Sequence, residues 1–193
     1  EIISYGLSLG ADFVEIFLEN TDNISVLVEE DFITSVSPSF GKGAGIRIFK
    51  DNRDGFVSTN DLSRNGLINS ITQAVEMLDI NTESIISKFE GLESLRNYST
   101  KKSTWLDTIP TIYEIGDKLL SSTKLLSTEK KVNVRKGSYS RNWQKVIIAS
   151  SDGTFAKDIR LHQTVGLNVI ASDKNHRSSG SRRFGSSDNP NDF

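Results

Sequence analysis

The chain has 193 residues, of which 36% are hydrophobic and 25% are charged, and its 23 basic and 25 acidic side chains nearly balance. This composition indicates a soluble, globular protein and excludes a disordered chain. The near-neutral charge weighs against a nucleic-acid partner, which would require a basic surface. The absence of cysteine excludes disulfides, thiol catalysis and zinc sites built on thiolates, so we expect a cytoplasmic protein. No apolar run has the length of a membrane-spanning helix.

The first part of the chain combines helical and extended patterns. Apolar side chains at helical spacing predict a short helix over residues 1–9, with Gly10 as its stop. An alternation of apolar and polar residues then predicts antiparallel strands joined by polar turns. These strands cover residues 12–19, 24–28, 32–36, 44–49 and 56–59. A second helix is predicted over residues 67–78, with Asp61 or Ser63 as its cap.

The second part of the chain shows one further helix and a second group of strands. Residues 79–107 are mostly polar, and their apolar residues do not recur at a helical or strand spacing. We therefore expect a long loop with one short helix over residues 83–89. A helix over residues 110–126 follows, with Thr108 as its cap. Its inward-facing residues are predicted to be Ile112, Ile115, Leu119 and Leu126. Consecutive hairpins are then predicted over residues 132–134, 143–149, 154–161 and 164–171.

Strands that occur in runs, rather than alternating singly with helices, are typical of an α+β domain. We expect a largely antiparallel sheet with helices packed on one face. This domain is predicted to cover residues 1–176. The tail, residues 177–193, is rich in Ser, Gly, Arg, Asn and Asp, and is expected to be a polar linker or the start of a carboxy-terminal domain. The basic cluster of Arg177, Arg182 and Arg183 is interpreted as a solvated segment of this tail.

The residue types that catalysis requires do not form a recognisable motif. A hydrolase needs a nucleophile with a base, a metal with its ligands, or paired carboxylates. The only histidines, His162 and His176, do not form a helical ligand pair, and no serine lies in a Gly-x-Ser-x-Gly turn. Asp51, Asp54 and Asp61 flank a predicted hairpin, where aspartate commonly stabilises turns and caps. We therefore expect neither a catalytic residue nor a metal ligand in this chain.

Two stretches nevertheless resemble motifs of the TldD/PmbA family. Residues 43–51 are similar to its G-x-G-[IV]-R strand, and residues 55–62 are similar to the G-[FW]-[AV]-S-T-x-D-[LI] strand that follows. The sequence of this second motif is nearer to the TldD branch than to the PmbA branch. Residues 146–160 are similar to a later I-A-x-S-x-G…D-x-R segment, and residues 11–15 resemble the opening G-A-D-[FY]-[AV]-E. We expect the matching residues to be structural. They are Gly43, Gly45, Arg47, Gly55, Phe56, Ser58, Thr59, Asp61, Ser151, Gly153, Asp158 and Arg160.

This resemblance implies a zinc-dependent peptidase of bacterial and archaeal cytoplasm, in which TldD- and PmbA-type subunits act together on peptides. In that family the zinc ligands come from a His-Glu-x-x-x-His helix in the carboxy-terminal half, and no position here matches it. The resemblance therefore implies a non-catalytic amino-terminal portion that holds no cofactor itself. Its implied partners are its own carboxy-terminal domain, a TldD/PmbA-type subunit in a homo- or hetero-oligomer, and an extended peptide that it helps to enclose.

Three other interpretations stay open at this point. The chain could be a fragment of the PmbA-like partner, which lacks zinc ligands throughout. It could be a stand-alone module that binds protein or nucleic acid, for which a salt-dependent DNA-binding assay would be decisive. It could also be an independent hydrolase, which turnover by the isolated chain would reveal.

Overall fold

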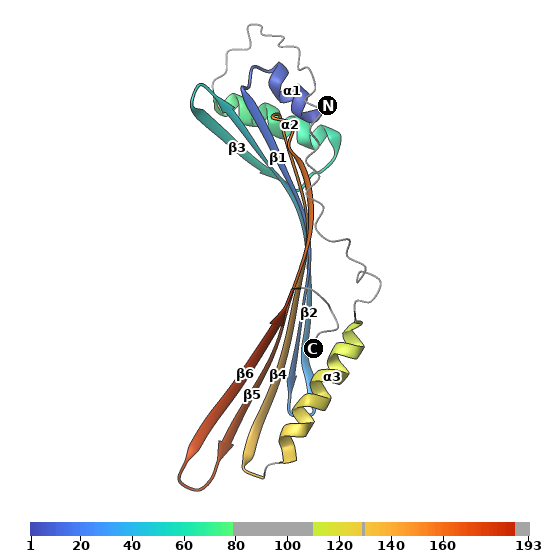
Figure 1. Cartoon of the computed structure of the whole chain (residues 1–193), viewed down its shortest axis with the longest axis vertical. Helices are drawn as coiled ribbons and strands as arrows, with labels where there is room; N and C mark the ends of the chain where they lie inside the picture. The colour runs from blue at the N-terminus through green and yellow to red at the C-terminus, as the bar shows by residue number, and fades with distance from the viewer. Residues whose placement is uncertain (79–109, 129, 188–193) are drawn as a thin grey trace. The chain divides into compact units, whose positions relative to one another are not determined.

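The computed structural model describes residues 1–78, 110–128 and 130–187 (Figure 1). The helices are α1 (Ile2–Ser8), α2 (Arg64–Met77) and α3 (Ile112–Leu125), and the short 3-10 helix η2 (Leu126–Thr128) follows α3. The strands are β1 (Phe13–Glu29), β2 (Phe32–Lys50), β3 (Arg53–Thr59), β4 (Val132–Ser150), β5 (Phe155–Ser172) and β6 (Arg177–Ser186). Within these ranges no helix is both long and apolar enough to cross a membrane. The short helix predicted over residues 83–89 lies outside the described residues.

The six strands form one antiparallel sheet in the order β3-β2-β1-β4-β5-β6. Strand β2 pairs with β3 from Ala44 opposite Thr59 to Lys50 opposite Arg53. At the other end of the order, β5 pairs with β6 over residues 163–172 and 177–186. The α+β prediction with a largely antiparallel sheet is therefore confirmed. The linker interpretation of the tail is wrong for residues 177–186, because these residues form a paired strand, while the domain boundary at residue 176 stays a prediction.

The described residues belong to two compact units, to which β1, β2, β4 and β5 each contribute. The described residues of unit 1 are 1–20, 41–78 and 145–159. Those of unit 2 are 21–40, 110–128, 130–144 and 160–187. Each unit has its own buried apolar cluster.

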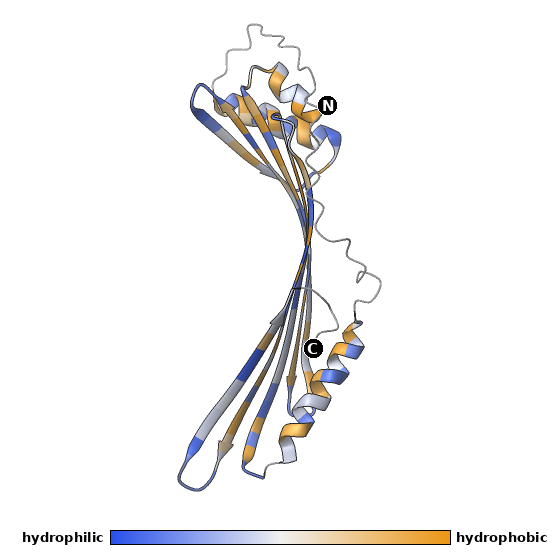
Figure 2. Cartoon of the chain, in the orientation of Figure 1, coloured by the Kyte–Doolittle hydropathy of each residue, from blue (hydrophilic) through white to orange (hydrophobic). Residues whose placement is uncertain are grey.

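The core of unit 1 lies between the sheet and two helices. It is built by alternate residues of β1 and β2 and by one face of α2, and α1 packs against it. The fully buried members include Val14, Ile46, Ile48, Ile71 and Ala74. Figure 2 shows this alternation of apolar and polar residues along the strands. Of the two predicted caps, Asp61 and Ser63, it is Ser63 that caps α2: its Oγ accepts a hydrogen bond from the Gly66 N–H at 3.1 Å.

The core of unit 2 lies between β1, β4 and α3. Ile24, Val26 and Val28 of β1 pack with Ile115 and Leu119 of α3 and with Tyr139 of β4. Because these β1 residues are two apart and the α3 residues are four apart, each element places them on one face.

The beginning of α3 differs from the sequence prediction. The cap is Thr111, which forms a reciprocal capping box with Glu114, whereas Thr108 lies outside the described residues. Ile112 was expected to face inward, but in the first turn of the helix it remains 39% exposed.

Four strands are much longer than predicted, with 17 to 19 residues each, compared with about five or six in a typical strand. The turn predicted at residues 20–23 is wrong, because β1 continues through it. The polar side chains there are stabilised across the sheet: Asp22 lies 3.5 Å from Arg141, and Asn142 donates a hydrogen bond to Asn23. Polar residues within β1 therefore mark cross-strand pairs rather than a reversal of the chain.

Candidate functional site

The first family-like stretch lies in the β2–β3 hairpin of unit 1. A Cβ atom at Gly55 would lie 2.5 Å from the carbonyl oxygen of Ala74, so only glycine allows β3 to approach α2 this closely. Gly45 lies next to the ring of Phe56, 3.1 Å from where its Cβ would be. Arg47 donates to Asp54 at 3.0 Å across the hairpin. These residues act together to fix the spacing of the hairpin and the helix.

The second half of the same motif leads into α2. The Thr59 hydroxyl accepts a hydrogen bond from the Asp61 N–H at 3.1 Å, and Asp61 accepts one from the Ser63 N–H at 2.9 Å. The hydroxyl and N–H of Ser63 lower the pKa of the Asp61 carboxyl from its usual value. Ser58 lies opposite Gly45 in the strand register, and Gly43 lies beside Asn60. The stretch is a local hydrogen-bonded turn that starts the helix.

The later family-like segment includes the turn after β4. Ser151 exchanges two hydrogen bonds with Val14: its N–H donates to the Val14 carbonyl at 2.8 Å and its Oγ accepts from the Val14 N–H at 3.0 Å. Gly153 has a φ of 88°, which favours glycine. Further along, Asp158 lies in β5 of unit 1, while Arg160 lies in unit 2 and donates to Gln144 at 3.5 Å. That all the motif residues are structural stays a prediction.

Neither histidine belongs to a group of three metal-binding side chains within the described residues. His162 is exposed on β5, and His176 lies 3.7 Å from Asp173 with 87% of its side chain exposed. Within residues 1–78, 110–128 and 130–187, no three His, Cys, Asp or Glu side chains are grouped so that they could hold a metal ion. We therefore assign no zinc ligand among these described residues, and that the zinc ion implied by the family resemblance lies outside this chain stays a prediction.

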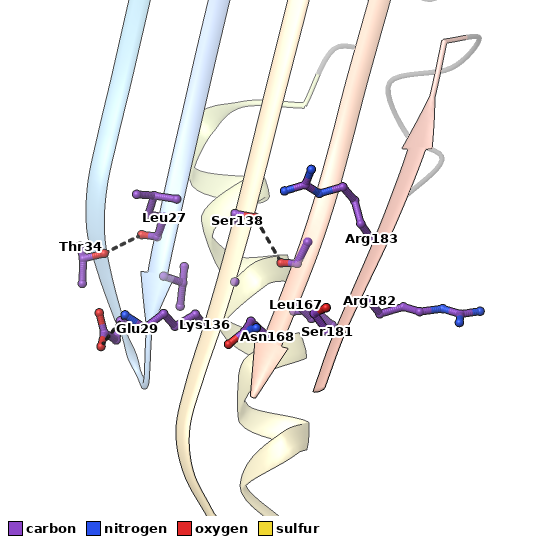
Figure 3. Close-up of a pocket in the computed structure, with 13 residues that line it drawn as sticks. Leu27, Glu29, Thr34, Lys136, Ser138, Leu167, Asn168, Ser181, Arg182 and Arg183 are labelled. Carbon is purple, nitrogen blue, oxygen red and sulfur yellow. Dashed lines mark hydrogen bonds and ion pairs between the residues drawn. The ribbon is translucent and has the colours of Figure 1, made fainter. Parts of the chain in front are cut away.

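A groove lies on the face of the sheet in unit 2 that is opposite α3, and we call it the unit 2 groove. Its cavity volume is about 480 Å³. Figure 3 shows its side chains on the strands, with α3 behind the sheet. The groove is lined by Leu27, Val28 and Glu29 of β1, Thr34 of β2, Lys136, Gly137 and Ser138 of β4, Gly166, Leu167 and Asn168 of β5, and Ser181, Arg182 and Arg183 of β6.

The hollow exists because the central positions on this face have small side chains. Gly166 lies beside Ser138, whose Oγ donates to the Gly166 carbonyl at 3.4 Å. A Cβ atom on Gly166 would lie only 2.7 Å from that Oγ. In the register of β5 and β6, Gly166 is opposite Arg183 and Asn168 is opposite Ser181. Serine and glycine thus form the floor, and longer polar side chains form the rim.

The rim of the groove carries one ion pair and one additional cation. Glu29 and Lys136 lie 3.2 Å apart, each about half exposed. Arg183 is exposed and has no ion-pair partner among the residues that the structure describes. Because successive strand residues point to opposite faces, Arg182 lies on the α3 side, 5.7 Å from the Phe184 ring centroid. The rim therefore has an excess of positive charge.

A buried arginine fixes the strands that line the groove. Arg135 of β4 has a side chain that is only 10% exposed, and its guanidinium donates to Glu30 at 2.7 and 2.9 Å. It also donates to Asp31 and to the carbonyl oxygen of Thr123, both at 3.4 Å. Hydrogen bonds from the backbone and side chain of Arg135 lower the pKa of the Glu30 carboxyl. This network connects the β1–β2 turn, β4 and α3.

The sequence did not indicate the groove, because its residues come from five strand segments far apart along the chain. One signal was the basic cluster of β6, although its composition is typical of a solvated tail. Small residues at alternate positions of β4 and β5 were a second signal, since Ser138 and Gly166 leave space on a face of a strand.

Comparisons with known proteins agree with the motifs. The model of the PmbA/TldA metallopeptidase domain 1 matches residues 14–78, and that of the PmbA/TldA metallopeptidase central domain matches residues 79–192. No curated protein matches the chain. Similar solved structures include a candidate modulator of DNA gyrase from Thermotoga maritima, with 17% identity and a TM-score of 0.77, and TldE from Thermococcus kodakarensis, with 20% identity and a TM-score of 0.78.

A third similar structure, a candidate modulator of DNA gyrase from Bacteroides thetaiotaomicron, has 15% identity and a TM-score of 0.70. These matches cover 100%, 98% and 99% of this chain and 43%, 43% and 44% of the three proteins. The chain thus spans less than half the length of each, and at these identities the likeness shows the fold alone. The two family models cover most of the sequence, and the chain belongs to the PmbA/TldD family of metallopeptidases, matching its first and central domains.

Proposed function

We propose that this chain is the non-catalytic amino-terminal portion of a TldD-like zinc metallopeptidase, and that it binds an extended peptide and helps to enclose it. The unit 2 groove is the observation that supports this proposal most strongly. Its volume of about 480 Å³ lies within the range of roughly 300 to 1,000 Å³ that ligand sites usually have. Its floor of glycine and serine leaves room for a main chain to approach the sheet.

The strand edge beside the groove offers a second means of holding a peptide. Strand β6 is the last in the sheet order, so its outer edge has no partner strand within the described residues. An extended peptide can pair with such an edge through backbone hydrogen bonds, which give affinity with little sequence preference. A peptidase that acts on unfolded chains requires this kind of recognition.

Under this proposal the zinc ion and the chemical step are supplied outside the chain, by a carboxy-terminal half with a His-Glu-x-x-x-His helix. The chain would contact that half and a TldD/PmbA-type subunit, and it would act in the cytoplasm. The PmbA/TldE-like alternative predicts the same groove but no zinc ligands anywhere in the longer protein. The presence or absence of the His-Glu-x-x-x-His sequence therefore separates the two.

The test compares cleavage of an unfolded peptide by the longer enzyme, together with its pairing subunit, with and without residues 1–193. We expect the deletion to reduce kcat/KM strongly, because the peptide is no longer held near the zinc site. A control measures zinc content, which should not change. Unchanged cleavage by the shortened enzyme would show that these residues do not enclose the substrate. Cleavage by the 193-residue chain alone would show that it is catalytic, contrary to the proposal.

A further inference from the structure

Strand β6 has an unusual composition for the edge of a sheet. Its sequence, RSSGSRRFGS, contains three arginines and no acidic residue, and nine of its ten residues are exposed. Charged residues on an edge strand ordinarily prevent it from pairing with other strands. A uniform positive charge, however, does not repel every strand, because a strand that carries carboxylates is attracted to it.

The arginines of β6 are divided between the two faces of the sheet. Arg183 is opposite Gly166 in the register and lies on the groove side, as Figure 3 shows. The position of a Cβ on Gly166 would be 3.9 Å from the Arg183 Nε, so the guanidinium side chain lies over the gap that glycine leaves. Arg182 lies on the other face, next to Phe184. Both residues line the groove, but a ligand there meets the guanidinium of Arg183, whereas the side chain of Arg182 lies on the other face of the sheet.

We propose that the unit 2 groove and the outer edge of β6 bind an extended acidic peptide segment, with a carboxylate of the segment paired to Arg183. This inference rests on the proposed function and specifies the class of peptide. When a segment pairs with β6, every second side chain points to the groove side. A glutamate or aspartate at such a position can accept two hydrogen bonds from the Arg183 guanidinium. Asn168 and Ser181 offer neutral polar groups further along the groove.

A peptide fits this surface better than a nucleic acid does. Lys136 is already paired with Glu29 at 3.2 Å, so the rim offers one further cation, Arg183, which matches a single carboxylate rather than a row of phosphates. The cations of β6 alternate between faces instead of forming a single row, and nucleic-acid binding depends on several cations along one backbone. The free backbone groups of a strand edge, in contrast, match those of another strand.

The test uses the full 193-residue chain and three fluorescein-labelled eight-residue peptides of alternating valine and a second residue, which is glutamate, glutamine or lysine. Fluorescence anisotropy at low salt gives the Kd of each. We expect the glutamate peptide to bind most tightly and the lysine peptide least. The Arg183→Gln variant should weaken binding of the glutamate peptide about two- to fivefold, the size of an exposed ion pair, and leave the glutamine peptide unchanged.

Two matched variants identify the arginine that is responsible. Arg177 lies six residues before Arg183 on the same strand, about 20 Å away at roughly 3.3 Å per residue, so Arg177→Gln should have no effect on the eight-residue peptide when it is centred at the groove. Arg182→Gln should also have no effect, because Arg182 lies on the α3 side. Circular dichroism of each variant should be unchanged, since all three side chains are exposed.

Each other outcome has a definite meaning. If the three peptides bind equally, or if Arg182→Gln rather than Arg183→Gln removes the preference for glutamate, the acidic site in the groove is wrong, while the proposed peptide-binding function stands. If none of the peptides binds, both proposals are wrong. If a 20-base-pair DNA duplex displaces the glutamate peptide and itself loses affinity in Arg183→Gln, the surface binds polyanions and not acidic peptides specifically.

Discussion

The Arg135 network provides the sharpest test of how unit 2 holds the strands of its groove. We consider the Glu30→Gln variant, which preserves the size of the side chain and removes its charge. The guanidinium of Arg135 donates its closest carboxylate hydrogen bonds, at 2.7 and 2.9 Å, to Glu30, and the Arg135 side chain is 10% exposed. Loss of that carboxylate leaves a largely buried cation with only Asp31 near it, at 3.4 Å.

The expected loss of stability in Glu30→Gln follows from the exposed fractions of the Arg135 and Glu30 side chains. Removal of one partner of a fully buried ion pair costs about 3 to 5 kcal/mol. Glu30 is 37% exposed, so water already screens part of the interaction and can solvate Arg135 after the substitution. We therefore expect a loss of about 2 kcal/mol in the free energy of unfolding at neutral pH. With a urea m-value of about 2 kcal/mol per molar, the midpoint should fall by about 1 M.

The neighbouring variant, Glu29→Gln, is the matched control. Glu29 and Lys136 are about half exposed, so the loss of their ion pair should cost less than about 1 kcal/mol. Urea unfolding of both variants and of the unsubstituted chain, monitored by circular dichroism, gives the free energies of unfolding to be compared.

The same experiment has a pH dependence of known sign. The pKa of Glu30 is lowered in the folded protein by hydrogen bonds from the backbone and side chain of Arg135. Its contribution to stability is therefore complete above the unfolded pKa of about 4.3 and is lost as the pH falls through the folded value. The difference in the free energy of unfolding between Glu30→Gln and the unsubstituted chain should therefore become smaller as the pH falls through this range. Equal effects of the two variants at pH 7, or a difference that does not change with pH, would refute this account of the network.

Two further predictions concern packing and capping. Gly55→Ala should destabilise the protein by about 1 to 3 kcal/mol, because the added methyl group would lie 2.5 Å from the carbonyl oxygen of Ala74. Gly180→Ala, whose methyl group would lie 3.6 Å from its nearest side-chain atom, should change thermal stability little, and equal losses in the two variants would contradict the packing explanation. Thr111→Ala should cost about 1 kcal/mol, because it removes the capping box with Glu114. An unchanged urea midpoint in Thr111→Ala would show that the cap does not stabilise α3.

The helices and the β2–β3 hairpin could be predicted from the sequence because their signals are local. The spacing of apolar residues located α1, α2 and α3, and the cap of α2 was among the two candidates. The hairpin followed from the turn at residues 51–55, where Asp51 and Asn52 adopt positive φ angles. In each case the information that decides the structure lies within a few residues of the element itself.

The long strands and the groove could not be predicted in this way. A polar run such as residues 20–23 is typical of a turn. Here it continues a strand because distant residues, Arg141 and Asn142, form an ion pair and a hydrogen bond with its side chains. Strand β6 is exposed on both faces, so it lacks the alternation that identifies half-buried strands and its composition resembles that of a linker. The groove arises where strands from separate parts of the sequence lie side by side. Its existence depends on the sheet order, which composition and spacing do not determine.

Cross-linking from the groove tests the central claim most directly, because the chain has no cysteine and an introduced one is a unique attachment point. Ser181→Cys places a thiol in the groove, whereas Ser178→Cys places one on the opposite face of the same strand. Each variant is labelled with a benzophenone and irradiated with the alternating valine and glutamate peptide. We predict a cross-link to the peptide from Ser181→Cys and none above background from Ser178→Cys. Equal yields, or cross-linking from Ser178→Cys alone, would show that the groove does not bind the peptide.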